Sequence, residues 1–226
     1  MADLATALLN WHKTHRRKFD WRETDDPYKV LIAEILLQKT DSQKAAKAYH
    51  RFIQECPSVY HLHRMELDKV YDLIRNIGLF YRARRLKKIA DQVISMFDGR
   101  VPDNKEDLMV LYGVGQYITN AVLCFAFKKR VPIVDTNVIR VYSRVFNIES
   151  SKPRPNTDKQ LWAFSKEQLP EKKFVEYNYA LLDFASSICK AKNPRCQVCP
   201  VNNSCQWQDK CMHAKISDKQ IRAGNG

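Results

Sequence analysis

Four cysteines near the C-terminal end constrain this chain more than any other sequence feature. They lie within seventeen residues, in the pattern Cys189-x6-Cys196-x2-Cys199-x5-Cys205. No secretory signal precedes them, so thiols inside the cell are expected rather than disulfides. Zinc sites typically pair two short Cys-x2-4-Cys knuckles. Here one short knuckle has longer arms on both sides, which favours a [4Fe–4S] cluster over zinc.

The other three cysteines fall outside this pattern. Cys56 and Cys124 are interpreted as small core or near-surface residues, and Cys211 as a spare thiol. None of the three is assigned to the cluster.

Helical periodicity dominates the rest of the chain and predicts an all-α fold. Apolar residues mostly recur at three- and four-residue spacing, and strand signals are scarce. Asp26-Pro27 is a helix-start signature, and the apolar run that follows to Leu37 predicts a buried helix. Further helices are predicted over 42–55, 66–74, 82–97, 105–112, 116–127, 136–146, 159–168 and 174–188. Residues 147–158 are expected to form a loop.

The charge balance predicts a polyanionic partner. Lys and Arg total 38 against 25 Asp and Glu, a net charge of +13. Nucleic acid and an anionic membrane surface both fit this charge. No stretch of about 18 apolar residues is present, so no membrane span is expected and the protein is assigned to the cytoplasm.

Two carboxylates occur in opposite settings. Asp135 directly precedes a predicted helix, where helix N–H groups favour the ionised form, although a cap without a catalytic role is the more common explanation for an isolated Asp. Glu34 lies inside an apolar helix, and a carboxyl group buried there is expected to keep its proton near neutral pH. A basic neighbour that satisfies Glu34 is the alternative. A proton-bearing acid beside a permanent anion is what cleavage of a glycosidic bond requires.

Two further motifs fit contact with DNA. Gly113-Val114-Gly115 separates two predicted helices, and such a turn can hold a phosphate on bare N–H groups. An ordinary helix–helix turn explains the same pattern. Phe80 is followed by Arg82, Arg84 and Arg85, which suits a wedge in a base stack with arginines on phosphates. A partly buried aromatic beside a solvated helix face fits equally well.

Taken in order, these motifs resemble the helix-hairpin-helix DNA glycosylase superfamily. This family contains endonuclease III, the adenine glycosylases and the archaeal-type thymine mismatch glycosylases. The resemblance covers nearly the whole chain. Besides the cysteines, it rests on Trp11-His12, Phe19-Asp20-Trp21-Arg22, Asp26-Pro27-Tyr28, the segment 33–40, Leu111-Tyr112-Gly113-Val114-Gly115 and the segment 134–141.

The resemblance implies two helical lobes with the active site in the cleft between them. A six-helix lobe carrying the helix-hairpin-helix motif is expected over residues 25–134. Residues 1–24 and 135–226 are expected to form the second lobe, with the [4Fe–4S] cluster held by the loop 189–205. Double-stranded DNA with a mismatched or damaged base is the implied partner. The protein is expected to act as a monomer, associated with the nucleoid in a prokaryote.

The resemblance also assigns catalytic roles. Asp135 matches the catalytic aspartate, which stabilises the developing sugar cation or aligns the attacking water, and Asn137 its supporting polar residue. Tyr117 occupies the position that holds a lysine in family members that form a Schiff base and cut the strand. Tyrosine cannot form a Schiff base, so a monofunctional enzyme that uses water is implied.

DNA-contacting residues follow from the same resemblance. Lys39 and Phe80 match positions from which side chains enter the duplex to support base flipping. Tyr112 departs from the family, which usually has proline before the hairpin glycines, and this change either loosens the turn or adds a stacking surface. The remaining residues assigned to DNA binding are Gln38, Leu111, Gly113, Val114, Gly115 and Arg140.

The excised base is predicted as thymine or uracil opposite guanine. Adenine glycosylases usually read Gln-Gln-Thr where this chain has Gln38-Lys39-Thr40, and they usually carry a C-terminal domain for oxidised guanine. Adenine opposite oxidised guanine or guanine is the alternative substrate, for which Glu34 would protonate the purine. A non-catalytic, cluster-bearing DNA-binding or redox-sensing protein is the alternative of another class.

Overall fold

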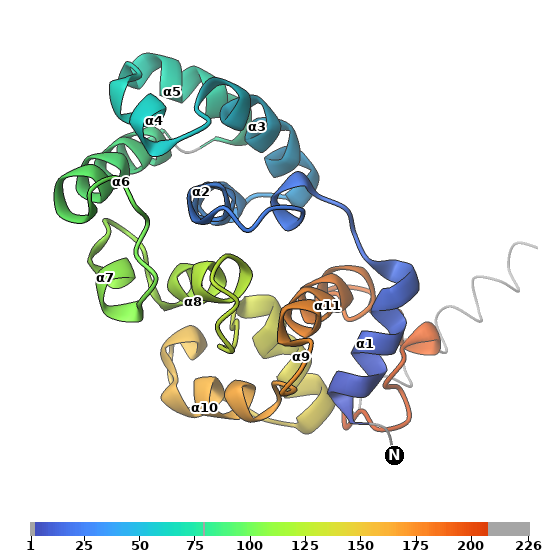
Figure 1. Cartoon of the computed structure of the whole chain (residues 1–226). Coiled ribbons are helices and arrows are strands. Elements are labelled where there is room, and N and C mark those ends of the chain that lie inside the picture. Colours follow the sequence, from blue (N-terminus) through green and yellow to red (C-terminus); the bar gives the residue numbers. More distant parts are fainter. Residues whose placement is uncertain (1–2, 79, 208–226) are drawn as a thin grey trace, which may run out of the picture. The chain divides into compact units, whose positions relative to one another are not determined.

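The structure is a computed structural model that describes residues 3–78 and 80–207, so Cys211 lies outside the described residues. In these ranges the regular elements are all helices, which confirms the all-α prediction (Figure 1). The chain forms two compact units, divided between Arg17 and Lys18 and between Lys129 and Arg130. None of the described helices has both the length and the apolar character needed to cross a bilayer.

The unit from residue 18 to residue 129 is organised around a buried helix. Helix α2 (Pro27–Leu37) starts at Asp26, whose carboxylate accepts hydrogen bonds from the N–H groups of Tyr28 and Lys29. It packs against α3, α6 and α8. Its residues Val30 to Leu36 are all buried, as the apolar run predicted. The other helices of this unit are α3 (Ser42–Glu55), α4 (Val59–Arg64), α5 (Leu67–Ile74), α6 (Tyr81–Phe97), α7 (Lys105–Val110) and α8 (Gln116–Phe125).

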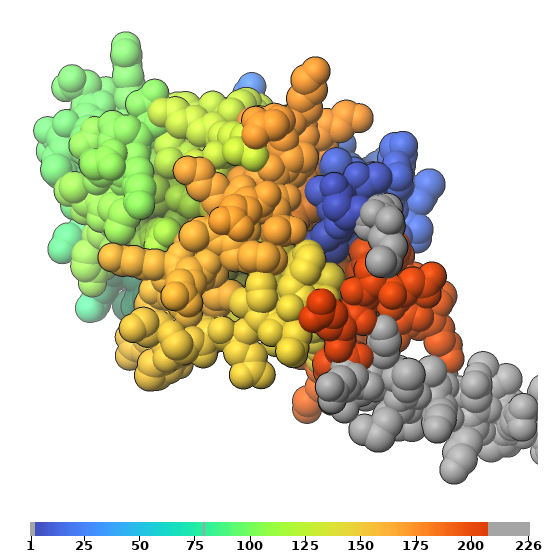
Figure 2. All heavy atoms as spheres, turned by 90° about the horizontal axis from the view of Figure 1, so that it is seen from below, coloured from blue at the N-terminus to red at the C-terminus, as the bar shows by residue number. Residues whose placement is uncertain are grey.

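The other unit combines residues up to 17 with residues from 130 onwards. Its helices are α1 (Leu4–His15), α9 (Thr136–Phe146), α10 (Lys159–Glu167) and α11 (Phe174–Ser187). Helices α1, α9 and α11 share one apolar core, and three of the four clustered cysteines pack against it. In the space-filling view, the C-terminal loop in red lies beside α1 in blue (Figure 2). Burial of this core positions the cysteine loop.

The predicted helices agree with the structure to within two residues at each end, with two omissions. Helix α7 ends at Val110 rather than at Tyr112, because Leu111 already has an extended backbone. Helices α1 and α4 were not predicted. Helix α1 has its own cap, since the side chain of Asp3 accepts a hydrogen bond from the N–H of Thr6.

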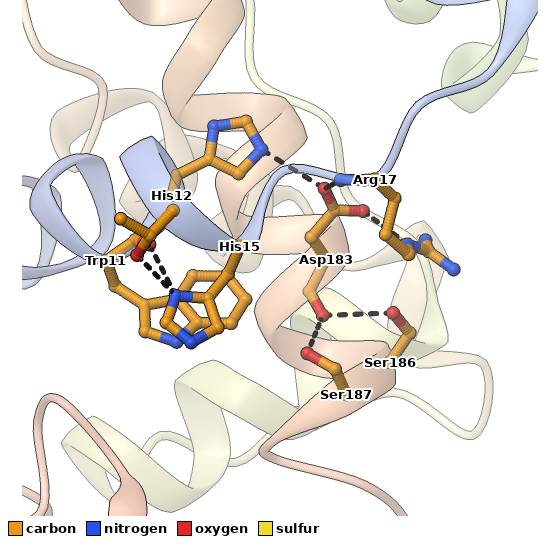
Figure 3. Close-up of polar contacts among 8 residues, drawn as sticks. Trp11, His12, His15, Arg17, Asp183, Ser186 and Ser187 are labelled. Atoms are coloured by element: carbon orange, nitrogen blue, oxygen red, sulfur yellow. Dashed lines mark hydrogen bonds and ion pairs between the residues drawn. The ribbon is translucent and has the colours of Figure 1, made fainter.

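A buried carboxylate on α11 anchors the N-terminal segment through hydrogen bonds (Figure 3). Asp183 is fully buried, and its Oδ2 lies 3.1 Å from Nε2 of His12. Its Oδ1 accepts a hydrogen bond of 2.6 Å from Nε of Arg17, and the backbone N–H of Arg17 donates to Oδ2 at 3.1 Å. One carboxylate therefore fixes the end of α1 and the chain that follows it.

We expect Asp183→Asn to destabilise the protein, because it removes the buried negative charge that the Arg17 guanidinium contacts. Removal of one partner from a buried ion pair costs about 3–5 kcal/mol. The thermal midpoint should therefore fall by about 6–20 °C. Asp20→Asn is the matched control, since Asp20 makes an exposed contact with His50 and should change the midpoint by at most a few degrees. Equal midpoints for the two variants would contradict this role of Asp183.

Candidate active site

Asp135 caps helix α9, as the sequence predicts. Its Oδ1 accepts hydrogen bonds from the backbone N–H groups of Asn137 at 2.9 Å and Val138 at 2.7 Å. Its Oδ2 accepts a bond of 2.7 Å from the side-chain amide of Asn137. Asp135 is only half-buried. Three N–H donors thus hold the carboxylate in one orientation, and a helix N-terminus favours its negative charge.

Asn137 and Arg140 connect this carboxylate to the cysteine loop. The side-chain oxygen of Asn137 accepts a hydrogen bond of 3.0 Å from Nη1 of Arg140. Nε of Arg140 donates to the carbonyl of Cys189 at 3.0 Å, and Nη2 donates to that of Ala185 at 2.8 Å. Arg140 therefore makes these bonds inside the protein, and a contact of Arg140 with DNA stays a prediction.

The four cysteines surround one pocket. Each of them is half-buried, and none of the four forms a disulfide. Burial raises the pKa of the Cys199 thiol to about 12. A thiol in this setting keeps its proton unless a bound metal centre replaces it. In the described part of the chain, no three His, Cys, Asp or Glu side chains converge closely enough to hold a single metal ion.

Arg144 supports the wall of this pocket. Its Nη1 donates to the carbonyl of Lys190 at 2.7 Å and lies 3.6 Å from the sulfur of Cys189. Its guanidinium also stacks over the ring of Trp207, 4.1 Å from the ring centre. The pocket thus combines sulfur donors with a nearby positive charge. This donor set suits an anionic metal–thiolate cluster.

Glu34 lies in the other unit, on the buried helix α2. Only 3 % of its surface is exposed, so the predicted burial is confirmed. Its apolar neighbours Ala33 and Ile35 are buried as well. Because Glu34 and Asp135 belong to different units, their joint action on one nucleotide stays a prediction.

The glycine motif forms a tight turn between α7 and α8. Gly113 has a φ of +71°, and a Cβ atom added there would lie 2.8 Å from Nε of Arg85. Both the backbone and the nearby arginine therefore require glycine. Gly115 precedes α8 without a side-chain cap, which leaves helix N–H groups for an external acceptor. Leu111 and Val114 are buried, so only their backbone can serve the predicted DNA contact.

Gln92 stabilises this turn where the family usually has proline. The N–H of Tyr112 donates to Oε1 of Gln92 at 2.7 Å, and Nε2 of Gln92 donates to the carbonyl of Val110 at 3.2 Å. The Tyr112 ring is half exposed, with the ammonium of Lys88 4.2 Å from its centre. Tyr112 is predicted either to loosen the turn or to add a stacking surface. The structure supports the second effect, because the exposed ring adds surface to a turn that Gln92 holds in place. Tyr117 follows in the first turn of α8 and is half-buried.

The residues predicted to enter the duplex are exposed. Lys39 lies at the tip of a turn after α2 and has a left-handed φ of +52°. Phe80 is 45 % exposed and rests against Tyr71, with 4.4 Å between ring centres. Gln38, on the same turn as Lys39, is half-buried.

The prediction that Arg82 and Arg85 hold phosphates is wrong for this structure. Arg82 is fully buried and Arg85 is 6 % exposed, and both donate to groups inside the protein. Of the three arginines in this segment, only Arg84 is exposed. The helical spacing in the sequence indicates this burial, because Arg82 and Arg85 share a face of α6 with the buried residues Leu86 and Ile89.

Comparisons with known proteins match most of the chain. The model of the HhH-GPD superfamily base excision DNA repair proteins matches residues 32–167, and that of the iron–sulfur binding domain of endonuclease III matches residues 189–205. The chain is 36% identical to a thymine/uracil-DNA glycosylase of Pyrobaculum aerophilum, over 90% of this chain and 91% of that protein. It is 31% identical to an adenine DNA glycosylase of Buchnera aphidicola, over 88% of this chain and 56% of that protein.

A solved structure agrees with these matches. The fold is similar to that of a thermostable thymine-DNA glycosylase, with a TM-score of 0.85 and 35% sequence identity. The similarity covers 92% of this chain and 95% of the other. The chain therefore belongs to the HhH-GPD superfamily of base excision DNA repair proteins, and it carries the iron–sulfur binding domain of endonuclease III.

Proposed function

We propose that this protein is a monofunctional DNA glycosylase that removes thymine or uracil opposite guanine by hydrolysis. The observation that carries the proposal is the fixed carboxylate of Asp135 at the start of α9. Relatives named thymine/uracil-DNA glycosylase and thymine-DNA glycosylase, at 36% identity, support the choice of base. The net charge of +13 suits a DNA partner.

The bonds of Asp135 leave it one clear chemical role. A carboxylate has about four lone-pair sites, and Oδ1 uses two of its sites on backbone N–H groups. Oδ2 uses one on the Asn137 amide, which leaves a site for a water molecule. Asp135 then orients the attacking water and stabilises the positive charge that develops on the sugar as the base departs.

Tyr117 and Glu34 have the other two proposed roles. A phenol cannot form a Schiff base with the sugar, so Tyr117 leaves water as the nucleophile and the DNA strand intact. Thymine and uracil have no strongly basic ring nitrogen. Glu34 therefore acts by binding the flipped base rather than by protonating it.

We also propose that Cys189, Cys196, Cys199 and Cys205 hold a [4Fe–4S] cluster in this pocket, which the match to the iron–sulfur binding domain supports. When bound, such a cluster cross-links four thiolates and carries net negative charge. Arg144 offsets that charge from beside Cys189. The cross-linked loop presents basic residues between Cys189 and Cys196, namely Lys190, Lys192 and Arg195, to the DNA backbone.

Adenine opposite oxidised guanine is the second candidate substrate. The adenine DNA glycosylase relatives favour it, and a buried Glu34 could protonate the purine ring. A panel of duplexes with thymine, uracil or adenine opposite guanine, and adenine opposite oxidised guanine, separates the two candidates in one assay.

We expect the wild-type protein to produce alkali-labile sites at thymine–guanine and uracil–guanine pairs, and Asp135→Asn to slow this by about a hundredfold or more. Asp158→Asn is the matched control, because Asp158 also caps a helix of the same unit and should leave excision largely intact. Borohydride should trap no covalent adduct. Efficient trapping would refute the hydrolytic mechanism, and release of adenine alone would refute the choice of base.

The cluster proposal predicts about four iron and four sulfide ions per chain in the purified protein, with a broad brown absorbance band. Cys196→Ser should lower both the iron content and the band. Cys124→Ser is the control, since Cys124 lies buried in the other unit and should retain the full iron content. One zinc ion per chain and no iron would contradict the assignment.

A further inference from the structure

Two arginines of α6 are buried, and neither has an acidic partner among the residues that the structure describes. Arg82 is fully buried and Arg85 is 6 % exposed, yet no described carboxylate lies within 4 Å of either guanidinium. Burial lowers the pKa of both groups from their usual value. Burial of a cation costs free energy. We therefore expect these two arginines to make hydrogen bonds that an apolar side chain could not make.

These bonds converge on two surface turns of the same unit. Arg82 donates to the carbonyl of Leu36 at 3.3 Å and to that of Gln38. Arg85 donates to the side-chain oxygen of Gln38 at 2.5 Å and to the carbonyl of Gly113. The turn that carries Lys39 and the glycine turn before α8 are therefore anchored to one helix.

The chemistry of arginine fixes the direction of the Gln38 amide. A guanidinium group only donates hydrogen bonds, so Arg85 must face the oxygen of that amide. The amino group of Gln38 then points away from Arg85, and it makes no hydrogen bond with any described protein atom. Gln38 is thus presented as a donor, whereas a free glutamine offers a donor and an acceptor equally.

From this geometry we infer that Arg85 is a positioning residue that makes Gln38 a dedicated hydrogen-bond donor to an oxygen atom of bound DNA. The inference rests on the proposed DNA-binding function. Arg82 holds the main chain of Gln38, so little side-chain or backbone freedom is left to lose on binding. The acceptor is either the O6 carbonyl of the guanine opposite the lesion or a phosphate oxygen.

Binding to duplexes that cannot be cleaved tests this inference without requiring base excision. The dissociation constant is measured for an undamaged duplex, for a stable abasic analogue opposite guanine, and for the same analogue opposite 2-aminopurine. The last lacks the guanine O6 carbonyl. The proteins are wild type, Gln38→Met, Arg85→Met and the double variant, with Arg75→Met as the control for loss of an exposed arginine charge in the same unit.

If Gln38 contacts a base carbonyl, each single variant should bind the analogue opposite guanine about tenfold more weakly than the wild type does. Binding of the analogue opposite 2-aminopurine should then differ little between the variants and the wild type. Loss of a phosphate contact should weaken all three duplexes alike. In either case the double variant should bind like the single variants, because both remove the same donor. Arg75→Met should show only the small loss that any exposed charge causes.

Three results would overturn the inference. These are wild-type affinity in Gln38→Met, wild-type affinity in Arg85→Met, or additive losses in the double variant. If Arg85→Met does not fold, Arg85→Lys takes its place, since a lysine cannot reach both Gln38 and Gly113 and should also weaken binding. Failure of the wild-type protein to bind any of the duplexes would instead refute the proposed function, and this inference with it.

Discussion

The capping of helix α9 by Asp135 is the interaction on which the rest of the site depends. One oxygen of the carboxylate satisfies two helix N–H groups, and the other is held by Asn137. The residue that starts the helix therefore also holds its carboxylate in a fixed orientation. Arg140 extends the connection from Asn137 to the carbonyl of Cys189, so the helix bearing the carboxylate and the cysteine loop share one set of hydrogen bonds.

In the other unit, buried side chains hold two exposed turns in place. Its apolar helix α2 supplies the core, and the turn after it places Lys39 in a left-handed conformation. Buried arginines of α6 and the side chain of Gln92 then satisfy backbone groups of the two turns. Side chains that lie inside the protein thus determine the shape of the surface proposed to contact DNA.

Local chemistry explains what the sequence predicted well. Asp26 and Asp135 marked helix starts because a short acidic side chain caps free N–H groups, and both caps are present. The cysteine spacing located the iron–sulfur binding domain. The apolar run around Glu34 predicted its burial, because all the other residues from Val30 to Leu37 are apolar and no polar face is left for solvent.

Long-range bonds explain what was missed. The helical spacing of Arg82 and Arg85 indicates which face of α6 they share, but nothing local indicates that they donate to carbonyls of distant turns. Helix α4 has only six residues, too short for a clear periodic pattern. Helix α1 buries little more than Leu4, Leu8 and His12, and its anchor Asp183 lies 171 residues from His12 in the chain.

The role of Asp135 can be tested most directly with an analogue of the charged sugar. We would compare the affinity for a duplex with a cationic pyrrolidine opposite guanine with that for the neutral tetrahydrofuran analogue. The wild-type protein should prefer the cation by about a hundredfold or more, and Asp135→Asn should lose most of this preference. Equal affinities in the wild type, or an unchanged preference in Asp135→Asn, would contradict the catalytic role of this carboxylate.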